Sequence, residues 1–168
     1  MEVYFLRHGE AGKRMALAAK DGERALTAAG REEMKEVGDA MADIGFKFDV
    51  IATSPLRRAK ETAAVVNKAL KRKSPLEEWP ELKPEGDRAM LYSRLGKLKA
   101  GSSVLCVGHE PYLTTAIGEL TSRGDGGTGF RIVLKKGGLA RLSVTGLGPR
   151  PAAELRWLLT PKQIRKMA

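Results

Sequence analysis

The stretch VYFLRHG, residues 3–9, joins a run of apolar side chains to a cation, an imidazole and a glycine. An uninterrupted apolar run of this length is typical of a strand buried on both faces, which we place at residues 2–7. Such a strand can simply reach the surface at Arg7 and turn. It can also end at a phosphate site, because arginine binds phosphate and histidine attacks it. The rest of the sequence has to decide between these interpretations.

The composition is that of a globular protein with a basic surface. Of its 168 residues, 42 % are hydrophobic and 30 % charged, so we expect one domain over residues 1–168. The formal net charge is +10, which favours an anionic partner: a phosphorylated metabolite, a phosphoprotein or a nucleic acid. A solvated basic surface without a specific role is an equal alternative.

Cysteine usage and the first residues indicate the compartment. Cys106, the only cysteine, lies in an apolar run, so we expect a buried thiol and no intrachain disulfide. The first apolar run is too short for a secretory leader, and no stretch approaches the length of a membrane span. These features predict a cytoplasmic protein.

Short apolar runs alternate with longer amphipathic ones, which predicts an α/β fold with a largely parallel sheet. Thr27 is expected to cap a helix that Gly45 ends, and Ser54 to cap a helix that starts at Pro55. The glycine-rich residues 124–129 lack the lysine and the spacing of a phosphate-binding P-loop, so we interpret them as a connection. We place helices at residues 28–43, 55–71, 87–99, between 111 and 121, and from 161. Further strands are expected at residues 49–53, 76–79, 103–107, 138–144 and 154–159.

Three of the predicted strands end in residues that can bind phosphate. The sequences at these ends are RHG at residues 7–9, TSPLRR at 53–58 and GHEP at 108–111. In an open α/β sheet, ligands bind beyond the carboxyl ends of the strands, so we expect the three ends to converge on one site. The two histidines of the chain, His8 and His109, both lie there, which makes a purely structural role for them an improbable coincidence.

The chemistry that these residues permit is phosphoryl transfer without a metal. A neutral His8 imidazole is a competent nucleophile toward phosphorus. Arg7 and Arg58 present planar forks of donors that match phosphate oxygens. His109, once protonated, adds a donor to the oxygens on which negative charge develops, and Gly9 lets the backbone approach the phosphate closely.

Two other uses of these residues fit the sequence less well. Metal binding needs further ligands, and no carboxylate or thiol accompanies the two histidines at ligand spacing, so we predict neither a metal nor another cofactor. Nucleic-acid binding usually combines basic residues with aromatic ones on which bases stack. Aromatic residues make up only 5 % of the chain and do not alternate with its Lys and Arg clusters.

The motifs resemble those of the histidine phosphatase superfamily, and more closely those of its small SixA-type branch of phosphohistidine phosphatases. The resemblance implies a phosphoglycerate-mutase-like three-layer α/β/α sandwich with a mostly parallel central sheet, no cofactor, and a ping-pong reaction through phospho-His8. It assigns phosphate binding to Arg58, which directly precedes an alanine, rather than to Arg57. The matching segments are RHGEA (residues 7–11), DGERALT (21–27), SPLRRAKETA (54–63), PELKPEGD (80–87), GHEP (108–111) and WLLTP (157–161).

The proton donor for the leaving group is the least defined part of the predicted site. Ester hydrolysis needs an acid, for which Glu81, Glu85 and Asp87 are available. We select Glu81, while turn and cap roles for all three are an equal alternative. A phosphohistidine substrate relaxes this demand, because its leaving imidazole is readily protonated near neutral pH. Arg24 can either reach the phosphate or form a structural salt bridge.

We therefore predict a metal-independent phosphatase that acts on a histidine-phosphorylated protein. The short segments 9–26 and 80–100 leave no room for the capping insertions of mutases and phytases, so the resemblance implies an open site suited to a protein surface. The first alternative is a broad-specificity phosphomonoesterase of small molecules that uses the same site. A more remote one is a non-catalytic phosphate- or nucleic-acid-binding module. The sequence leaves the physiological substrate and the oligomeric state open.

Overall fold

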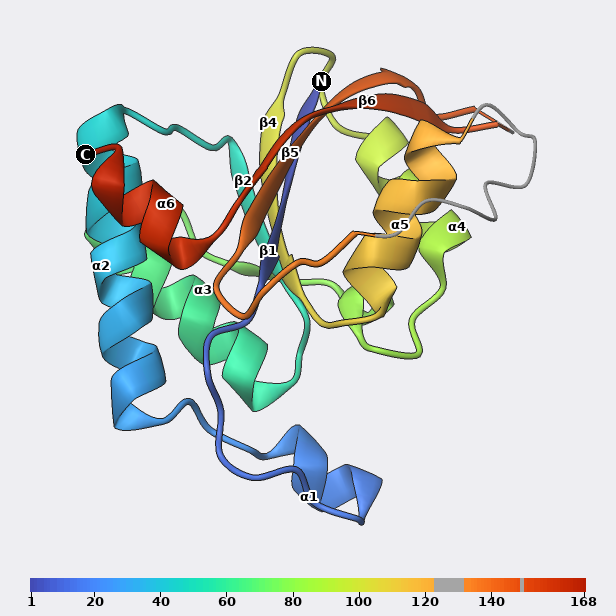
Figure 1. The fold of residues 1–168 in the computed structure, drawn as a ribbon. Helices are drawn as coiled ribbons and strands as arrows, with labels where there is room; N and C mark the ends of the chain where they lie inside the picture. The colour runs from blue at the N-terminus through green and yellow to red at the C-terminus, as the bar shows by residue number, and fades with distance from the viewer. Residues whose placement is uncertain (123–131, 149) are drawn as a thin grey trace.

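A computed structural model describes residues 1–122, 132–148 and 150–168, whose arrangement is shown in Figure 1. The predicted connection at residues 124–129 lies outside the described residues. In chain order the elements are β1 (Glu2–Arg7), α1 (Ala18–Gly22), α2 (Ala28–Ile44), β2 (Val50–Thr53), α3 (Arg57–Ala69), β3 (Glu77–Glu78), the 3₁₀ helix η1 (Pro80–Leu82), α4 (Arg88–Gly96), β4 (Ser103–Gly108), α5 (Tyr112–Thr121), β5 (Leu139–Gly146), β6 (Ala152–Leu159) and α6 (Pro161–Lys166).

The strands form one sheet in the order β3-β2-β4-β1-β5-β6. Four neighbouring strands are parallel. β4 forms parallel pairs with β1 and with β2, and β2 forms a parallel pair with β3. β5 and β6 add an antiparallel edge, which a short connection between them permits. Helices α2, α3 and α6 cover one face and α4 and α5 the other (Figure 1). The predicted three-layer α/β/α sandwich is thereby confirmed.

The apolar run of β1 supplies side chains to both layers of the core. Val3 and Phe5 pack beneath α4 and α5, whereas Tyr4 and Leu6 pack beneath α2 and α3. A strand with helices on both faces has no solvent-facing side, which explains why the run shows no polar alternation. The predicted burial of the Cys106 thiol is confirmed.

The structure confirms one predicted helix start and corrects another. The Thr27 hydroxyl accepts from the backbone N–H of Gly30 and caps α2, and Gly45 ends that helix in the left-handed conformation with φ 90°. Ser54 is not the cap of α3, because the helix begins at Arg57 and its N-cap is Leu56. The Ser54 hydroxyl lies instead 2.8 Å from the ring of His109.

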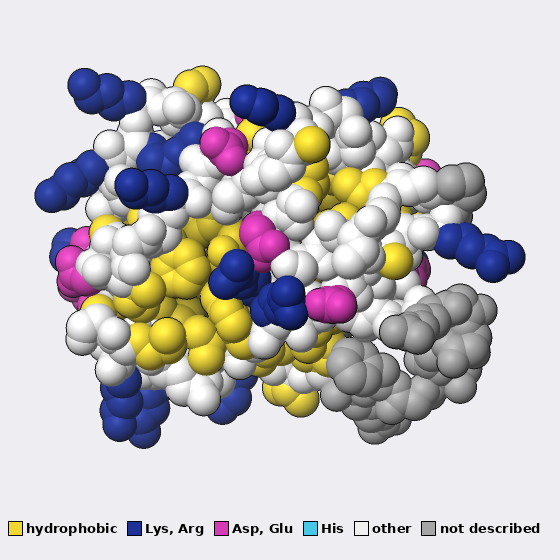
Figure 2. All heavy atoms as spheres, turned by 90° about the horizontal axis from the view of Figure 1, so that it is seen from above, with side chains coloured by type: hydrophobic (Ala, Val, Ile, Leu, Met, Phe, Trp, Pro, Cys, Tyr) yellow, Lys and Arg dark blue, Asp and Glu magenta, His cyan; other side chains and the backbone are white. Residues whose placement is uncertain are grey.

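Four aromatic side chains gather at the end of the sheet where the parallel strands begin. The ring centroid of Tyr4 lies 5.6 Å from that of Phe46, 5.1 Å from Phe48 and 5.9 Å from Trp157, all in edge-on contact. Figure 2 views the molecule from this end and shows hydrophobic side chains exposed beside basic ones. The residues predicted to bind phosphate lie at the opposite end, so these rings provide no base-stacking surface there. No helix in the described parts of the chain is long and apolar enough to span a membrane.

Candidate active site

The parallel register of β1 and β4 brings the two histidines together. Arg7 pairs with Gly108, so the next residue of each strand, His8 and His109, emerges at the same edge of the sheet. The backbone N–H of His8 donates to the Gly108 carbonyl at 3.0 Å, and the two imidazole centroids lie 5.1 Å apart. β2 lies on the other side of β4, where the Ser54 N–H donates to the carbonyl of Val107 at 3.0 Å. The three strand ends therefore converge, as the sequence predicted.

Hydrogen bonds fix the tautomer and the orientation of the His8 ring. Its Nδ1 lies 2.7 Å from the carbonyl oxygen of Gly9. A carbonyl only accepts, so Nδ1 carries the proton and Nε2 keeps its lone pair. The Arg58 Nε donates to that Nε2 at 3.2 Å. Nε2 is thus the ring nitrogen that is available as a nucleophile, and it is held beside a guanidinium.

Burial keeps the His8 ring neutral. Only 7 % of the residue is exposed. Burial, with the positive charges of Arg58 and Arg7 as smaller contributions, lowers the pKa of His8 to about 4. At neutral pH nearly every molecule therefore holds His8 in the form that can attack phosphorus.

Gly9 and Thr62 connect the His8 segment to α3. The Gly9 N–H donates to the Thr62 hydroxyl at 3.0 Å, and that hydroxyl donates to the Arg58 carbonyl at 2.7 Å. A Cβ on Gly9 would lie 2.6 Å from Cγ of Met34, so glycine is needed for this close packing. Its role in phosphate binding stays a prediction. Thr62 was not assigned from the sequence, although it belongs to the SPLRRAKETA motif.

Asp21 positions two arginines of the site. Arg58, only 4 % exposed, donates from Nη1 to the Asp21 backbone carbonyl at 2.9 Å and lies 3.5 Å from its carboxylate. Arg24 lies 2.9 Å from the same carboxylate and donates to the Gly12 carbonyl at 2.8 Å. The pKa of Asp21 is lowered chiefly by a hydrogen bond from the Met15 N–H and further by Arg24. Arg24 therefore forms the salt bridge that the sequence left as one of two possibilities, and its phosphate contact stays a prediction.

Arg7 lies at the edge of the site, and among the described residues not all of its N–H groups have a hydrogen-bond acceptor. Its Nη1 donates to the Leu134 carbonyl at 2.9 Å. Its Nε is buried and has no hydrogen-bond partner among the described residues. A buried donor left without an acceptor is unfavourable, so this guanidinium is suited to an incoming anion.

His109 is the more deeply buried of the two histidines, with 1 % of the residue exposed. Burial, followed by the electrostatic effects of His8 and Arg58, lowers its pKa to about 2, so the ring is neutral in the ligand-free site. Ser54 accepts from the Leu56 N–H, so its own proton is free for His109 Nε2 at 2.8 Å. His109 Nδ1, which has no partner in the described residues, can then carry a proton toward a phosphoryl oxygen.

Only one of the three carboxyls considered as proton donors has a clear alternative role. Asp87 accepts from the backbone N–H groups of Ala89 and Met90 and caps α4, as the alternative interpretation expected. Glu85 is exposed. Glu81 lies in η1 with one carboxylate oxygen 3.2 Å from Arg94 Nε and the other buried without a partner among the described residues.

Glu110 is a further carboxyl that sequence reasoning did not consider. It follows His109 directly, and its Oε2 accepts from the Thr114 hydroxyl at 2.7 Å. Its Oε1 is buried, without a hydrogen-bond partner in the described parts of the chain. Burial raises the pKa of Glu110, against the opposing effects of Thr114 and the Arg7 charge. Its place in the GHEP motif, directly after His109, is the sequence signal that could have identified it.

Known proteins are similar to this chain in sequence and in fold. The model of the histidine phosphatase superfamily, branch 1, matches residues 3–84. The chain is 31 % identical over 122 residues to phosphohistidine phosphatase SixA of Escherichia coli strain K12, covering 71 % of this chain and 74 % of that protein. This chain belongs to the histidine phosphatase superfamily. An uncharacterised protein of Picosynechococcus is 36 % identical over 145 residues, which cover 84 % of each chain.

Solved structures of the superfamily agree with this assignment. A protein histidine phosphatase SixA complexed with tungstate superimposes with a TM-score of 0.82 at 26 % identity, covering 96 % of this chain and 98 % of that one. A phosphatase from Escherichia coli described as acting on α-ribazole-5′-P has a TM-score of 0.71 at 22 % identity, which supports the fold alone. The chain is a phosphatase of the SixA-type branch with a phosphoglycerate-mutase-like fold.

The lowered pKa of His8 predicts an unusually acidic limit to activity. We expect kcat/KM for p-nitrophenyl phosphate, corrected for ionisation of the substrate, to stay level from about pH 7 to about pH 5. Below a pH of about 4 it should fall tenfold per pH unit, because His8 becomes protonated. Circular dichroism at each pH checks that the protein is still folded. A fall in kcat/KM centred at about pH 6.5, which is the ordinary pKa of histidine, would contradict a buried, neutral nucleophile.

Proposed function

We propose that this phosphatase removes the phosphoryl group from a histidine-phosphorylated protein through a phospho-His8 intermediate. The observation that carries the proposal is the neutral His8 ring, whose Nδ1 proton is bound by the Gly9 carbonyl and whose Nε2 accepts from Arg58. This arrangement provides a nucleophile without a base to activate it. The similarity to SixA proteins supports phosphohistidine as the group attacked.

The first step transfers the phosphoryl group to the enzyme. Nε2 of His8 forms a bond to phosphorus as the N–P bond of the substrate breaks, and the bonding electrons return to the substrate imidazole. When that ring is already protonated on its other nitrogen, it leaves as a neutral imidazole, so no enzyme acid is needed. Arg7 and Arg58 compensate the charge of the phosphoryl oxygens, and the Nδ1–H of His109 adds a donor.

The second step returns the enzyme to its starting state. Water attacks phosphorus, the Nε2–P bond of phospho-His8 breaks, and inorganic phosphate leaves with both protons of the water distributed between itself and solvent. When the Nε2–P bond breaks, the His8 ring is released in its neutral form, because its Nδ1 has kept the proton that is hydrogen-bonded to the Gly9 carbonyl. No atom of either step requires a metal, so we propose that the reaction is metal-independent.

Hydrolysis of small phosphate esters is a second candidate function that a specific observation favours. The leaving group of an alkyl phosphate ester is an alkoxide, which needs a proton from an acid. Glu81 and Glu110 each carry a buried carboxyl oxygen without a hydrogen-bond partner among the described residues. The raised pKa of Glu110 increases the fraction of its protonated form. These two carboxyls are therefore our candidates for the acid that ester substrates demand.

Phosphate release by wild type and His8→Ala, in excess chelator, tests the proposed function. The substrates are a protein phosphorylated on histidine, p-nitrophenyl phosphate and several sugar phosphates. We expect the wild type to prefer the phosphohistidine protein and His8→Ala to lose at least about 10³-fold in kcat, as removal of a nucleophile does. Circular dichroism verifies that His8→Ala is folded.

Three other results of this assay would contradict the proposal. Faster turnover of sugar phosphates than of the phosphohistidine protein would identify the small-molecule phosphomonoesterase. A wild-type activity that the chelator abolishes would contradict the metal-independent mechanism. An absence of hydrolysis with every substrate would favour the non-catalytic binding module.

The two carboxyls can be separated by their effect on N–P and O–P substrates. We expect Glu110→Gln and Glu81→Gln to leave hydrolysis of the phosphohistidine protein within about threefold of wild type, because its leaving imidazole needs no acid. The variant that lacks the acid should lose about 10²-fold in kcat with sugar phosphates, whose alkoxide leaving group needs the proton, and much less with p-nitrophenyl phosphate, whose phenolate leaves unprotonated. Equal losses with both kinds of substrate would show that the carboxyl maintains the site rather than donating a proton.

A further inference from the structure

A hollow of about 460 Å³ lies beside the candidate active site and is lined in part by Arg7. Its lining contains four cations and one carboxylate, and no aromatic side chain. The lining residues are Arg7, Glu33, Lys135, Lys136, Thr160, Pro161 and Lys162. We call it the basic hollow.

Backbone hydrogen bonds fix the basic hollow to the nucleophile. The Gly137 N–H donates to the carbonyl of Arg7 at 3.0 Å and lies 3.3 Å from that of His8, while the Arg7 N–H donates to the Gly138 carbonyl at 3.1 Å. Gly137 has a φ of 66°, a conformation that favours glycine. The turn that carries Lys135 and Lys136 is therefore attached to the two residues that hold and attack the phosphoryl group.

Most of the positive charge of the basic hollow is uncompensated. Lys135, Lys136 and Lys162 are exposed. Lys136 Nζ lies 3.8 Å from a Glu10 carboxylate, at the outer limit of an ion pair. Within the described residues Lys135 and Lys162 form no ion pair, and the single carboxylate of the lining, Glu33, lies 3.9 Å from Arg165. An anionic group that enters the hollow meets two lysines without a competing carboxylate partner.

We propose that the basic hollow binds acidic side chains that flank the phosphohistidine of a protein substrate. This inference rests on the proposed function and names the feature by which the substrate is recognised. A substrate whose phosphoryl group reaches His8 also lies against Arg7, so its neighbouring residues extend into the hollow. Aspartate or glutamate side chains match exposed lysines, whereas the lack of aromatic side chains in the lining offers no stacking surface to a nucleic acid.

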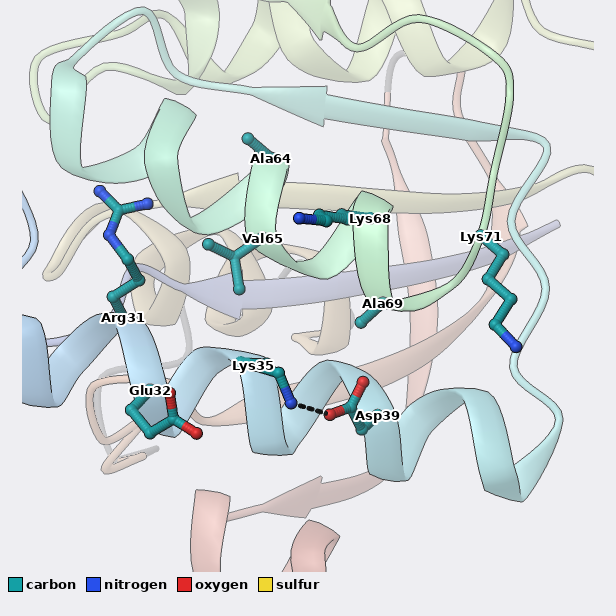
Figure 3. Close-up of a pocket in the computed structure, with 9 residues that line it drawn as sticks. All are labelled: Arg31, Glu32, Lys35, Asp39, Ala64, Val65, Lys68, Ala69 and Lys71. Carbon is teal, nitrogen blue, oxygen red and sulfur yellow. Dashed lines mark hydrogen bonds and ion pairs between the residues drawn. The ribbon is translucent and has the colours of Figure 1, made fainter.

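A larger hollow of about 480 Å³ between α2 and α3 provides a matched control. Figure 3 shows that Arg31 and Lys35 lie along α2, with Lys68 and Lys71 on the opposite side. This hollow also contains Glu32 and Asp39, and Lys35 donates to Asp39 at 2.8 Å. None of its lining residues lies at a carboxyl end of the strands. Changing Lys68 and Lys71 therefore alters the net charge by the same amount without altering the basic hollow.

The test uses two phosphohistidine peptides of equal length, one with aspartates beside the phosphohistidine and one with asparagines. We expect wild type to hydrolyse the acidic peptide with a kcat/KM about tenfold higher at low ionic strength, mainly through KM. The double variant Lys135→Glu/Lys162→Glu should lose this preference, and Lys68→Glu/Lys71→Glu should keep it. The preference should shrink as salt approaches about 0.3 M, because exposed charges are screened.

The outcomes separate this proposal from the proposed function. Equal hydrolysis of both peptides by wild type, or equal loss of preference in both double variants, would overturn docking in the basic hollow and leave the phosphohistidine phosphatase intact. The proposal would also be overturned if Lys135→Glu/Lys162→Glu lowered kcat/KM for the asparagine peptide as strongly as for the acidic peptide. Hydrolysis of p-nitrophenyl phosphate without hydrolysis of either peptide would refute the proposed function, and docking with it.

Discussion

The parallel pairing of β1 with β4 is the constraint on which the site depends. Because Arg7 lies opposite Gly108, each strand delivers its next residue, a histidine, to the same point at the edge of the sheet. The hydrogen bond from the His8 N–H to the Gly108 carbonyl continues the ladder by one step and holds the two ring centroids 5.1 Å apart. Strands buried on both faces allow little movement of this register, since a slip would exchange the two core layers.

Burial then determines the chemistry of the two rings. Neither His8 nor His109 is paired with a carboxylate in the described parts of the chain. Arg58 is hydrogen-bonded to His8, and its positive charge also acts on His109. Desolvation and positive charge act in the same direction and lower both pKa values, to about 4 and about 2. A site that already contains arginines holds its nucleophile as a free base. In the proposed mechanism the same positive charges favour the phosphoryl oxygens of the substrate, so one arrangement would support both binding and attack.

The sequence predicted the features that local patterns encode. The buried run before His8, the Thr27 cap and the glycine at the end of α2 each depend on near neighbours in the chain, and all are confirmed. The parts that were missed depend on contacts between distant segments. Ser54 looked like a helix cap because serine precedes proline there, yet its hydroxyl lies against His109, which is 55 residues away. Asp21 and Glu110 gain their importance only from arginines and buried surroundings that the fold supplies.

The central claim is that Nε2 of His8 becomes phosphorylated during turnover, which a trapped intermediate tests most directly. Enzyme mixed with a phosphohistidine protein is quenched in alkali, where a phosphoramidate survives, and then examined by peptide mass spectrometry and phosphorus NMR. The account predicts a phosphoryl group on His8, attached through Nε2, that disappears as inorganic phosphate forms. Phosphorylation of His109, attachment through Nδ1 of His8, or turnover without any phosphorylated enzyme would contradict it.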